Sequence, residues 1–123
     1  MTTPATPLTI DAVRAVDRTA PRVVPDPAGY DRVTGDWAEA EYRAVEIADD
    51  SLGGLWEGEP GEVFFESWPY TEFCVVISGR VAVRDDAGAR REFGPGEAFV
   101  VPRGFRGTWE TLEPSVKYFV AMR

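Results

Sequence analysis

The regular recurrence of glycine and proline at expected turns is the feature of this sequence that most limits its fold. From residue 42 onward, turn-forming residues recur at intervals of about eight to twelve positions. Short runs rich in β-branched and aromatic residues lie between them, at 42–48, 54–59, 62–68, 72–78, 80–86, 97–102, 105–112 and 116–123. Such spacing is typical of an all-β sandwich or barrel. We therefore predict a β-barrel over residues 42–123.

The N-terminal part of the chain has a different character. Its first 35 residues contain five of the ten prolines. Proline is excluded from the interior of a helix and from the middle of a sheet, so a long helix or a central strand is not expected there. We predict that residues 1–41 form a Pro-rich N-terminal arm and edge segment, packed on a partner or along a sheet edge.

Length and charge exclude several classes of function. A chain of 123 residues is long enough for one core and too short for two domains. The net charge of −8 argues against a nucleic-acid partner, which needs a clustered basic surface, and against an anionic membrane. No apolar run approaches the roughly 20 residues that span a bilayer. The sequence thus predicts a cytoplasmic protein, and its charge alone implies no partner.

Few residues can carry chemistry, because the chain has no histidine and one cysteine. Cys74 lies in the apolar run 72–78 and is expected to be a buried hydrophobic residue rather than a nucleophile. Glu72 opens the same run, so its carboxylate would lose hydration and need a cationic partner or a proton. Lys117, in the last predicted strand, is the best candidate for that partner.

Two spacing patterns resemble the motifs of the cupin family. Gly96, Pro102 and Gly104 occupy the first three fixed positions of the second cupin motif, and Glu72 and Gly79 fit the end of the first motif. Over residues 35–122 the chain is similar to the small cupins grouped with ureidoglycine aminohydrolase; the matching stretches are GLWEGEPG, TEFCVVISGRVAV, FGPGEAFVVPRGFRGTWE and VKYFV. This resemblance implies an RmlC-like jelly-roll barrel, commonly a homodimer.

The resemblance also defines where a metal would be held. Metal-type cupins use three histidines and a glutamate, and only Glu72 is retained here. The histidine position of the second motif falls on Gly107, and the paired positions of the first fall on Glu66 and Trp68 or on Phe65 and Ser67. Because these residues are poor ligands for a transition metal, we predict no metal and no cofactor. A glycine at position 107 is expected to leave space in the cavity.

Strand alternation then gives a candidate site. If the ligand positions face inward, Glu72, Gly107 and Trp109 face one cavity. We predict Glu72 and Lys117 as the catalytic pair. The predicted substrate-binding residues are Trp56, Glu66, Trp68, Arg106, Trp109 and Tyr118. The tryptophans can equally be core residues, and Glu72 and Lys117 can equally form a structural ion pair.

Three functions remain open from the sequence. The first is a metal-independent enzyme, such as an isomerase, lyase or amidohydrolase-like enzyme, in which Glu72 transfers a proton and Lys117 or Arg106 stabilises negative charge. The second is a protein that binds a small ligand without converting it. The third is a structural or oligomerisation module whose cavity is filled by its own side chains. The family resemblance favours the first, with a small molecule as the partner that the protein acts on.

Overall fold

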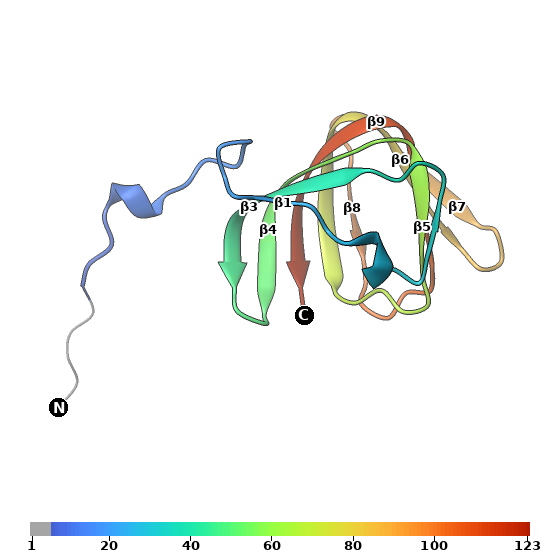
Figure 1. The fold of residues 1–123 in the computed structure, drawn as a ribbon, viewed down its shortest axis with the longest axis horizontal. Coiled ribbons are helices and arrows are strands. Elements are labelled where there is room, and N and C mark those ends of the chain that lie inside the picture. Colours follow the sequence, from blue (N-terminus) through green and yellow to red (C-terminus); the bar gives the residue numbers. More distant parts are fainter. Residues whose placement is uncertain (1–5) are drawn as a thin grey trace.

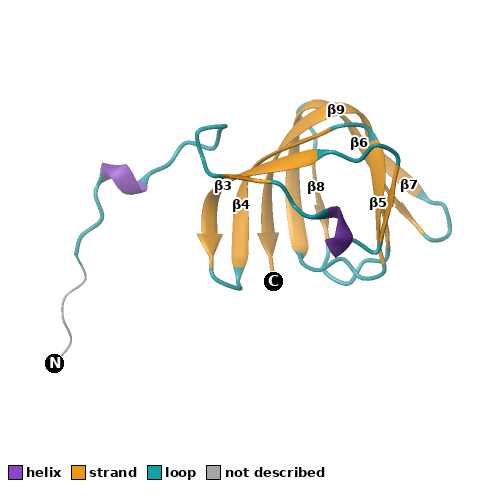
Figure 2. Ribbon diagram, in the orientation of Figure 1, coloured by secondary structure: helices purple, strands orange, loops and turns teal. Residues whose placement is uncertain are grey.

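The computed structural model describes residues 6–123, and most of its regular structure is β-strand (Figure 2). The strands are β1 (Arg22–Val23), β2 (Arg32–Thr34), β3 (Glu39–Ile47), β4 (Ser51–Gly58), β5 (Gly61–Phe65), β6 (Thr71–Asp85), β7 (Arg90–Phe93), β8 (Ala98–Val101) and β9 (Gly107–Met122). Two 3₁₀ helices, η1 (Ile10–Ala12) and η2 (Pro27–Gly29), precede the main strands. The all-β prediction is confirmed.

Two long strands organise the barrel. β6 has 15 residues and β9 has 16, and they pair antiparallel over most of their length. β9 also pairs with β4 and β5, while β6 pairs with β7 and β8. β9 pairs with three strands, and the antiparallel sheet curls round on itself (Figure 1). This curled antiparallel sheet has the form expected of a jelly roll.

The long strands bend where their pairing register shifts. The shifts fall between Val76 and Val81 on β6. Gly79 lies at this bend with a φ of 85°, a conformation that favours glycine. A Cβ at Gly79 would collide with Ser115 and with the backbone of Pro114. Glycine is therefore required on both conformational and steric grounds.

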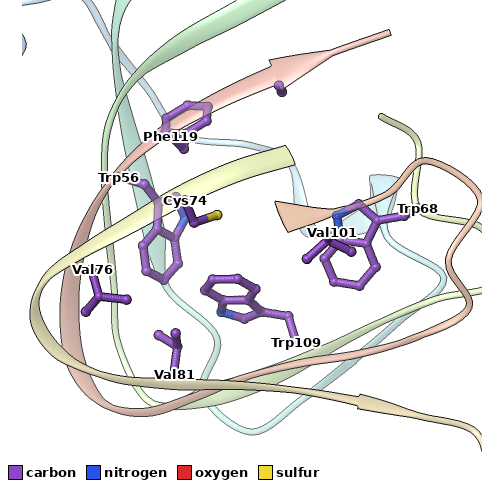
Figure 3. Packing of buried hydrophobic residues seen from close by; sticks show 9 residues of the cluster. Trp56, Trp68, Cys74, Val76, Val81, Val101, Trp109 and Phe119 are labelled. Atoms are coloured by element: carbon purple, nitrogen blue, oxygen red, sulfur yellow. The ribbon is translucent and has the colours of Figure 1, made fainter. Parts of the chain in front are cut away.

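Apolar side chains form two clusters, one inside the barrel and one outside. The inner cluster contains Trp56, Trp68, Cys74, Val76, Val81, Val101, Trp109, Phe119 and Ala121 (Figure 3). The outer cluster contains Ala40, Tyr42 and Leu55, with Ala20 packed against it. The chain around Ala20 thus covers part of the outer surface of the barrel.

Residues 22–41 were predicted as part of an N-terminal arm, but two of their segments pair with strands of the barrel. β1 pairs with β3 and β2 pairs with β5, and these pairs lie at opposite ends of the strand order β1-β3-β4-β9-β5-β2. The chain between β1 and β2, which includes η2, therefore runs across the open side of the curled sheet (Figure 2). Residues 6–16, by contrast, lead away from the barrel (Figure 1).

Within residues 6–123, no helix has the length and apolar character needed to span a membrane.

Candidate functional site

A cavity of about 50 Å³ lies inside the curled sheet. Its lining combines eight aromatic rings with three carboxylates, one ammonium group and one valine. These residues are Tyr30, Trp37, Glu39, Glu41, Trp56, Val63, Phe65, Trp68, Tyr70, Glu72, Trp109, Lys117 and Phe119. The cavity is thus a predominantly aromatic site with a small number of charged groups, which is the usual composition of a small-ligand pocket.

A buried ion pair lies at the inner side of the cavity. Lys117 Nζ on β9 is 2.6 Å from Glu72 Oε2 on β6, and the two residues are only 4% and 7% exposed. Burial alone lowers the pKa of Lys117, but its contacts with Cys74 and Glu72 raise it, and the net direction is upward. Lys117 is therefore a cation in the folded protein.

The Lys117 ammonium group is surrounded on its remaining sides. It lies 3.9 Å from the centre of the Trp109 ring and 4.9 Å from that of Trp56, both within the range of a cation–π interaction. Cys74 Sγ lies 3.4 Å from Lys117 Nζ and donates to Glu72 over the same distance. Burial raises the pKa of the Cys74 thiol, which is fully buried as predicted.

Five of the predicted site residues are brought together at the cavity. Trp68 Nε1 donates to Glu72 Oε1 over 3.3 Å, so the second carboxylate oxygen also has a partner. Trp56 and Trp109 contact each other edge to face, with ring centres 5.7 Å apart. The view in Figure 3 shows Trp56 and Trp109 beside Cys74, with Trp68 beyond Val101. The geometry groups these side chains, whereas their functional roles stay predictions.

The other three predicted substrate-binding residues lie outside the cavity. Glu66 is exposed just after β5, and Arg106 is exposed and pairs with Asp86. Tyr118 is 44% exposed because it directly follows Lys117 on β9, and neighbouring residues of a strand face opposite sides. Tyr118 therefore lies on the outer face of the sheet.

The expectation that Gly107 leaves space in the cavity is wrong. Gly107 is buried, and a Cβ there would collide with the Phe105 ring and with the backbone oxygen of Arg84. Phe105 packs on Trp68, with ring centres 6.0 Å apart. The place that a ligand side chain would need is filled by the protein's own aromatic packing.

A second carboxylate, which the sequence analysis missed, is held by three neutral donors. Glu39 accepts hydrogen bonds from Tyr30 Oη at 2.5 Å, Trp37 Nε1 at 2.6 Å and Trp56 Nε1 at 2.9 Å. Among the ion pairs of residues 6–123, none involves Glu39. Among the residues that the structure describes, its carboxylate therefore has hydrogen-bond donors but no ion-pair partner.

Glu41, two residues further along β3, is the third carboxylate of the cavity. It is 9% exposed and pairs with Arg43 at 3.0 Å. Burial raises the pKa of Glu41, and the neighbouring Arg43 offsets only part of that rise. Burial, together with the charge of Glu72, also raises the pKa of Tyr70 well above its ordinary value. Trp37, Glu39 and Glu41 occur at every second position, so in an extended segment their side chains share one face. This spacing is the sequence signal that could have identified them as site residues.

Comparison with known families explains the scaffold. The model of the EutQ-like cupin domain matches residues 48–119. The chain belongs to the EutQ-like cupin family. Its jelly-roll fold and the sequence-based resemblance to cupins are thereby confirmed at the level of the cupin domain.

Solved structures similar to this EutQ-like cupin share its fold. The EutQ protein of Clostridium difficile is 16% identical with a TM-score of 0.62, and the match covers 71% of this chain and 64% of that one. A putative ethanolamine utilization protein from Salmonella typhimurium is 16% identical with a TM-score of 0.58, covering 69% of each chain. A Pseudomonas syringae protein of the DUF861 family is 19% identical with a TM-score of 0.70, covering 87% and 46%. No curated protein matches the chain.

The residues of this EutQ-like cupin do not fit the metal site that the cupin resemblance implies. Glu72 is already occupied by Lys117 and Trp68, and Phe105 fills the space beside Gly107. Across residues 6–123, no three histidine, cysteine, aspartate or glutamate side chains are arranged to hold an ion. The positive charge beside Glu72 is that of Lys117, 2.6 Å away.

We expect the purified protein to contain no stoichiometric transition metal after dialysis against a chelator. The physical reason is the donor set, which offers carboxylates and one protonated thiol where zinc, nickel, iron and manganese sites need imidazole, thiolate or several free carboxylates. Elemental analysis by mass spectrometry measures this directly. One equivalent of any of these metals would contradict the prediction.

Proposed function

We propose that this EutQ-like cupin binds a small cationic amine in its aromatic cavity. The observation that carries the proposal is Glu39, a carboxylate at the cavity that has three neutral donors and, within residues 6–123, no ion-pair partner. A charge of this kind is stabilised when an opposite charge comes within a few ångströms. The ammonium group of an amine would supply that charge.

The sum of charges in the cavity supports the same ligand class. The cavity lining has three carboxylates and one ammonium group, that of Lys117, which pairs with Glu72. Arg43, outside the lining, is shared between Glu41 and Glu46, so the cavity carries an excess of negative charge. Aromatic faces attract ammonium groups through their π electrons, and Lys117 already makes this contact with Trp109. An anionic ligand would meet carboxylates without a free cation. The cavity therefore favours a cation over a neutral or an anionic molecule.

Size restricts the ligand further. The cavity volume of about 50 Å³ is a few times the roughly 10–15 Å³ that one water requires. A molecule of a few non-hydrogen atoms fits this space, as a primary amine with a short chain does. Two of the similar solved structures are described as EutQ or ethanolamine utilization proteins, which makes ethanolamine a suitable first probe.

We expect isothermal titration calorimetry to detect ethanolamine and not its neutral and anionic counterparts, ethylene glycol and glycolate. Phosphate buffer is needed, since Tris is itself an amine. Glu39→Gln should weaken ethanolamine binding by about tenfold or more, because it removes the charge that pairs with the ammonium group. The matched control is Glu59→Gln on an exposed glutamate, which should bind as the wild type does. Preferential binding of glycolate, or equal binding by Glu39→Gln, would contradict the proposal.

Proton transfer is a second candidate, and the buried Glu41 is the observation that favours it. A carboxyl group whose pKa is raised by burial is better suited to act as a general acid or base near neutral pH. This alternative keeps the metal-independent enzyme predicted from the sequence, including the amidohydrolase-like reaction that the ureidoglycine aminohydrolase resemblance suggests. It transfers the proton step from Glu72, which Lys117 neutralises, to Glu41. Turnover of amine-bearing substrates that is lost in Glu41→Gln would support it.

A further inference from the structure

We propose that a groove between β7 and β8 is a second ligand site of this EutQ-like cupin, and that it binds a small aromatic carboxylate. The groove has a volume of about 530 Å³, within the roughly 300–1,000 Å³ of small-molecule sites. The proposal goes beyond the amine site in the aromatic cavity and does not depend on it. It rests on an aromatic floor and on one arginine that faces this floor.

The groove exists because two short strands pair with different parts of one bent strand. Among the strands that the structure describes, β7 and β8 each pair with β6 alone. β8 pairs with residues 72–75 of β6, and β7 pairs with residues 81–84, beyond the bend. The bend turns the inner sides of β7 and β8 toward each other, and the rings of Phe93 and Phe99 stack across the groove with centres 4.1 Å apart.

The floor of the groove is apolar and mostly aromatic. Its side chains are those of Val83 on β6, Phe93 on β7, Phe99 and Val101 on β8, and Phe105 just beyond β8. The three phenylalanines are only half-buried, so their rings are partly open to a ligand. Aromatic rings attract one another in stacked or edge-to-face arrangements. The ring of a ligand would therefore extend an aromatic cluster that the protein has already built.

Arg91 supplies a positive charge beside this floor. It lies opposite Val83 in the pairing of β6 with β7, and Val83 packs on the inner cluster, so Arg91 projects from the same side of β7 as Phe93. Arg91 is exposed, and none of the ion pairs formed within residues 6–123 involves it. A guanidinium group binds a carboxylate through two parallel, charge-assisted hydrogen bonds.

The other charged residues that line the groove already have partners. Arg90 pairs with Glu110 at 2.9 Å on the opposite side of β7. Asp85 accepts hydrogen bonds from two backbone amides of its own turn. Of the lining charges that the structure describes, Arg91 is the one without a partner. The charge that the groove offers to a ligand is therefore positive, and its complement is an anion.

A layer of aromatic rings separates the groove from the aromatic cavity. The ring centre of Phe99 is 5.9 Å from that of Trp109, and the ring centre of Phe105 is 6.0 Å from that of Trp68. Both tryptophans line the cavity, whose volume of about 50 Å³ is about a tenth of that of the groove. The two sites thus lie on opposite sides of one layer of rings. They differ in size and in the sign of the charge they attract, so an aromatic acid fits the groove and not the cavity.

Isothermal titration calorimetry of the full chain with phenylacetate tests the site. We expect phenylacetate to bind at least tenfold more tightly than the neutral 2-phenylacetamide, because only the carboxylate pairs with Arg91. Arg91→Gln should weaken phenylacetate binding by about tenfold or more and leave phenylacetamide binding unchanged. The matched control is Arg14→Gln, on an exposed arginine outside the groove, which should bind both compounds as the wild type does. Absence of phenylacetate binding, as when a second copy of the chain covers the groove, or equal binding by Arg91→Gln, would overturn the proposal.

Two further variants locate the bound acid. Phe93→Leu should weaken phenylacetate and phenylacetamide alike, by about fivefold, because it removes an aromatic contact and leaves the charge of Arg91 in place. Its circular dichroism spectrum shows whether the barrel is intact, and unchanged binding by a folded Phe93→Leu protein would contradict the proposal. Glu39→Gln alters the cavity and not the groove, so it should bind phenylacetate as the wild type does. Loss of phenylacetate binding in Glu39→Gln would place the acid in the cavity and overturn the proposal.

Discussion

Lys117→Met is expected to destabilise the protein by about 3–5 kcal/mol, the usual cost of breaking a buried ion pair from one side. The substitution leaves the Glu72 carboxylate inside the barrel without the cation that lies 2.6 Å away in the wild type. Glu72→Gln should be destabilising for the reciprocal reason. Equilibrium unfolding in guanidinium chloride, monitored by far-UV circular dichroism, measures the free energy of unfolding of each variant.

The double variant decides whether the ion pair is structural. If Lys117 and Glu72 serve mainly to neutralise each other, Lys117→Met combined with Glu72→Gln should recover much of the loss. Lys117 is also the chain's only lysine, the other twelve cationic side chains being arginines. The Lys117 ammonium group is enclosed by Glu72, Cys74 and two indole rings, so the larger guanidinium group of Lys117→Arg would overpack this space and should also be destabilising. Additive losses in the double variant would show that the two side chains act separately.

Gly107→His is expected to lower the free energy of unfolding by about 3 kcal/mol or more and to create no metal site. This substitution restores the histidine of the second cupin motif. In this barrel, however, the Phe105 ring and the Arg84 backbone oxygen occupy the position that the new Cβ would take. Urea unfolding gives the loss of stability, and a titration with zinc followed by calorimetry tests for metal binding.

The control for Gly107→His is the same substitution at a glycine with open space around it. A Cβ at Gly29 would have no neighbour within 4 Å, and its backbone needs no left-handed conformation. Gly29→His should therefore change stability by less than about 0.5 kcal/mol. A Gly107→His protein as stable as Gly29→His would show that Phe105 can move aside, and that the barrel keeps room for a ligand at this position.

The strand content could be predicted from the sequence, but the continuity of the strands could not. Runs 72–78 and 80–86 were expected as separate strands because Gly79 looks like a turn; they are one bent strand, β6. Pro114 lies in the same way inside β9. Gly79 and Pro114 lie at bends rather than at strand ends because pairing with distant strands keeps the chain extended on both sides. This long-range pairing cannot be predicted from the local sequence. The turn from Asp85 to Gly88 is, by contrast, held locally, because the Asp85 side chain accepts from Ala87 and Ala89 and the Gly88 amide donates to the Asp85 carbonyl.

The inner half of the candidate site could be predicted, whereas the outer half could not. Glu72 and Lys117 were recognisable because charged residues in apolar strands must find partners. Glu39 and Trp37 were missed because the prolines before them gave residues 1–41 the character of an arm. Their contribution depends on β1 and β2 pairing with distant strands, which brings this segment across the open side of the barrel. Long-range pairings of that kind leave little trace in a single sequence.

Every tryptophan of the chain lines the same cavity. The four are Trp37, Trp56, Trp68 and Trp109, so no tryptophan outside the cavity contributes to the fluorescence. Trp56 has ring centres 6.4 Å and 5.7 Å from those of Trp37 and Trp109, close enough for their excited states to couple. The intrinsic fluorescence and near-ultraviolet dichroism of this protein are thus optical signals of the cavity itself. Binding of a molecule in the cavity should therefore change the intrinsic tryptophan fluorescence and can be followed without an attached dye.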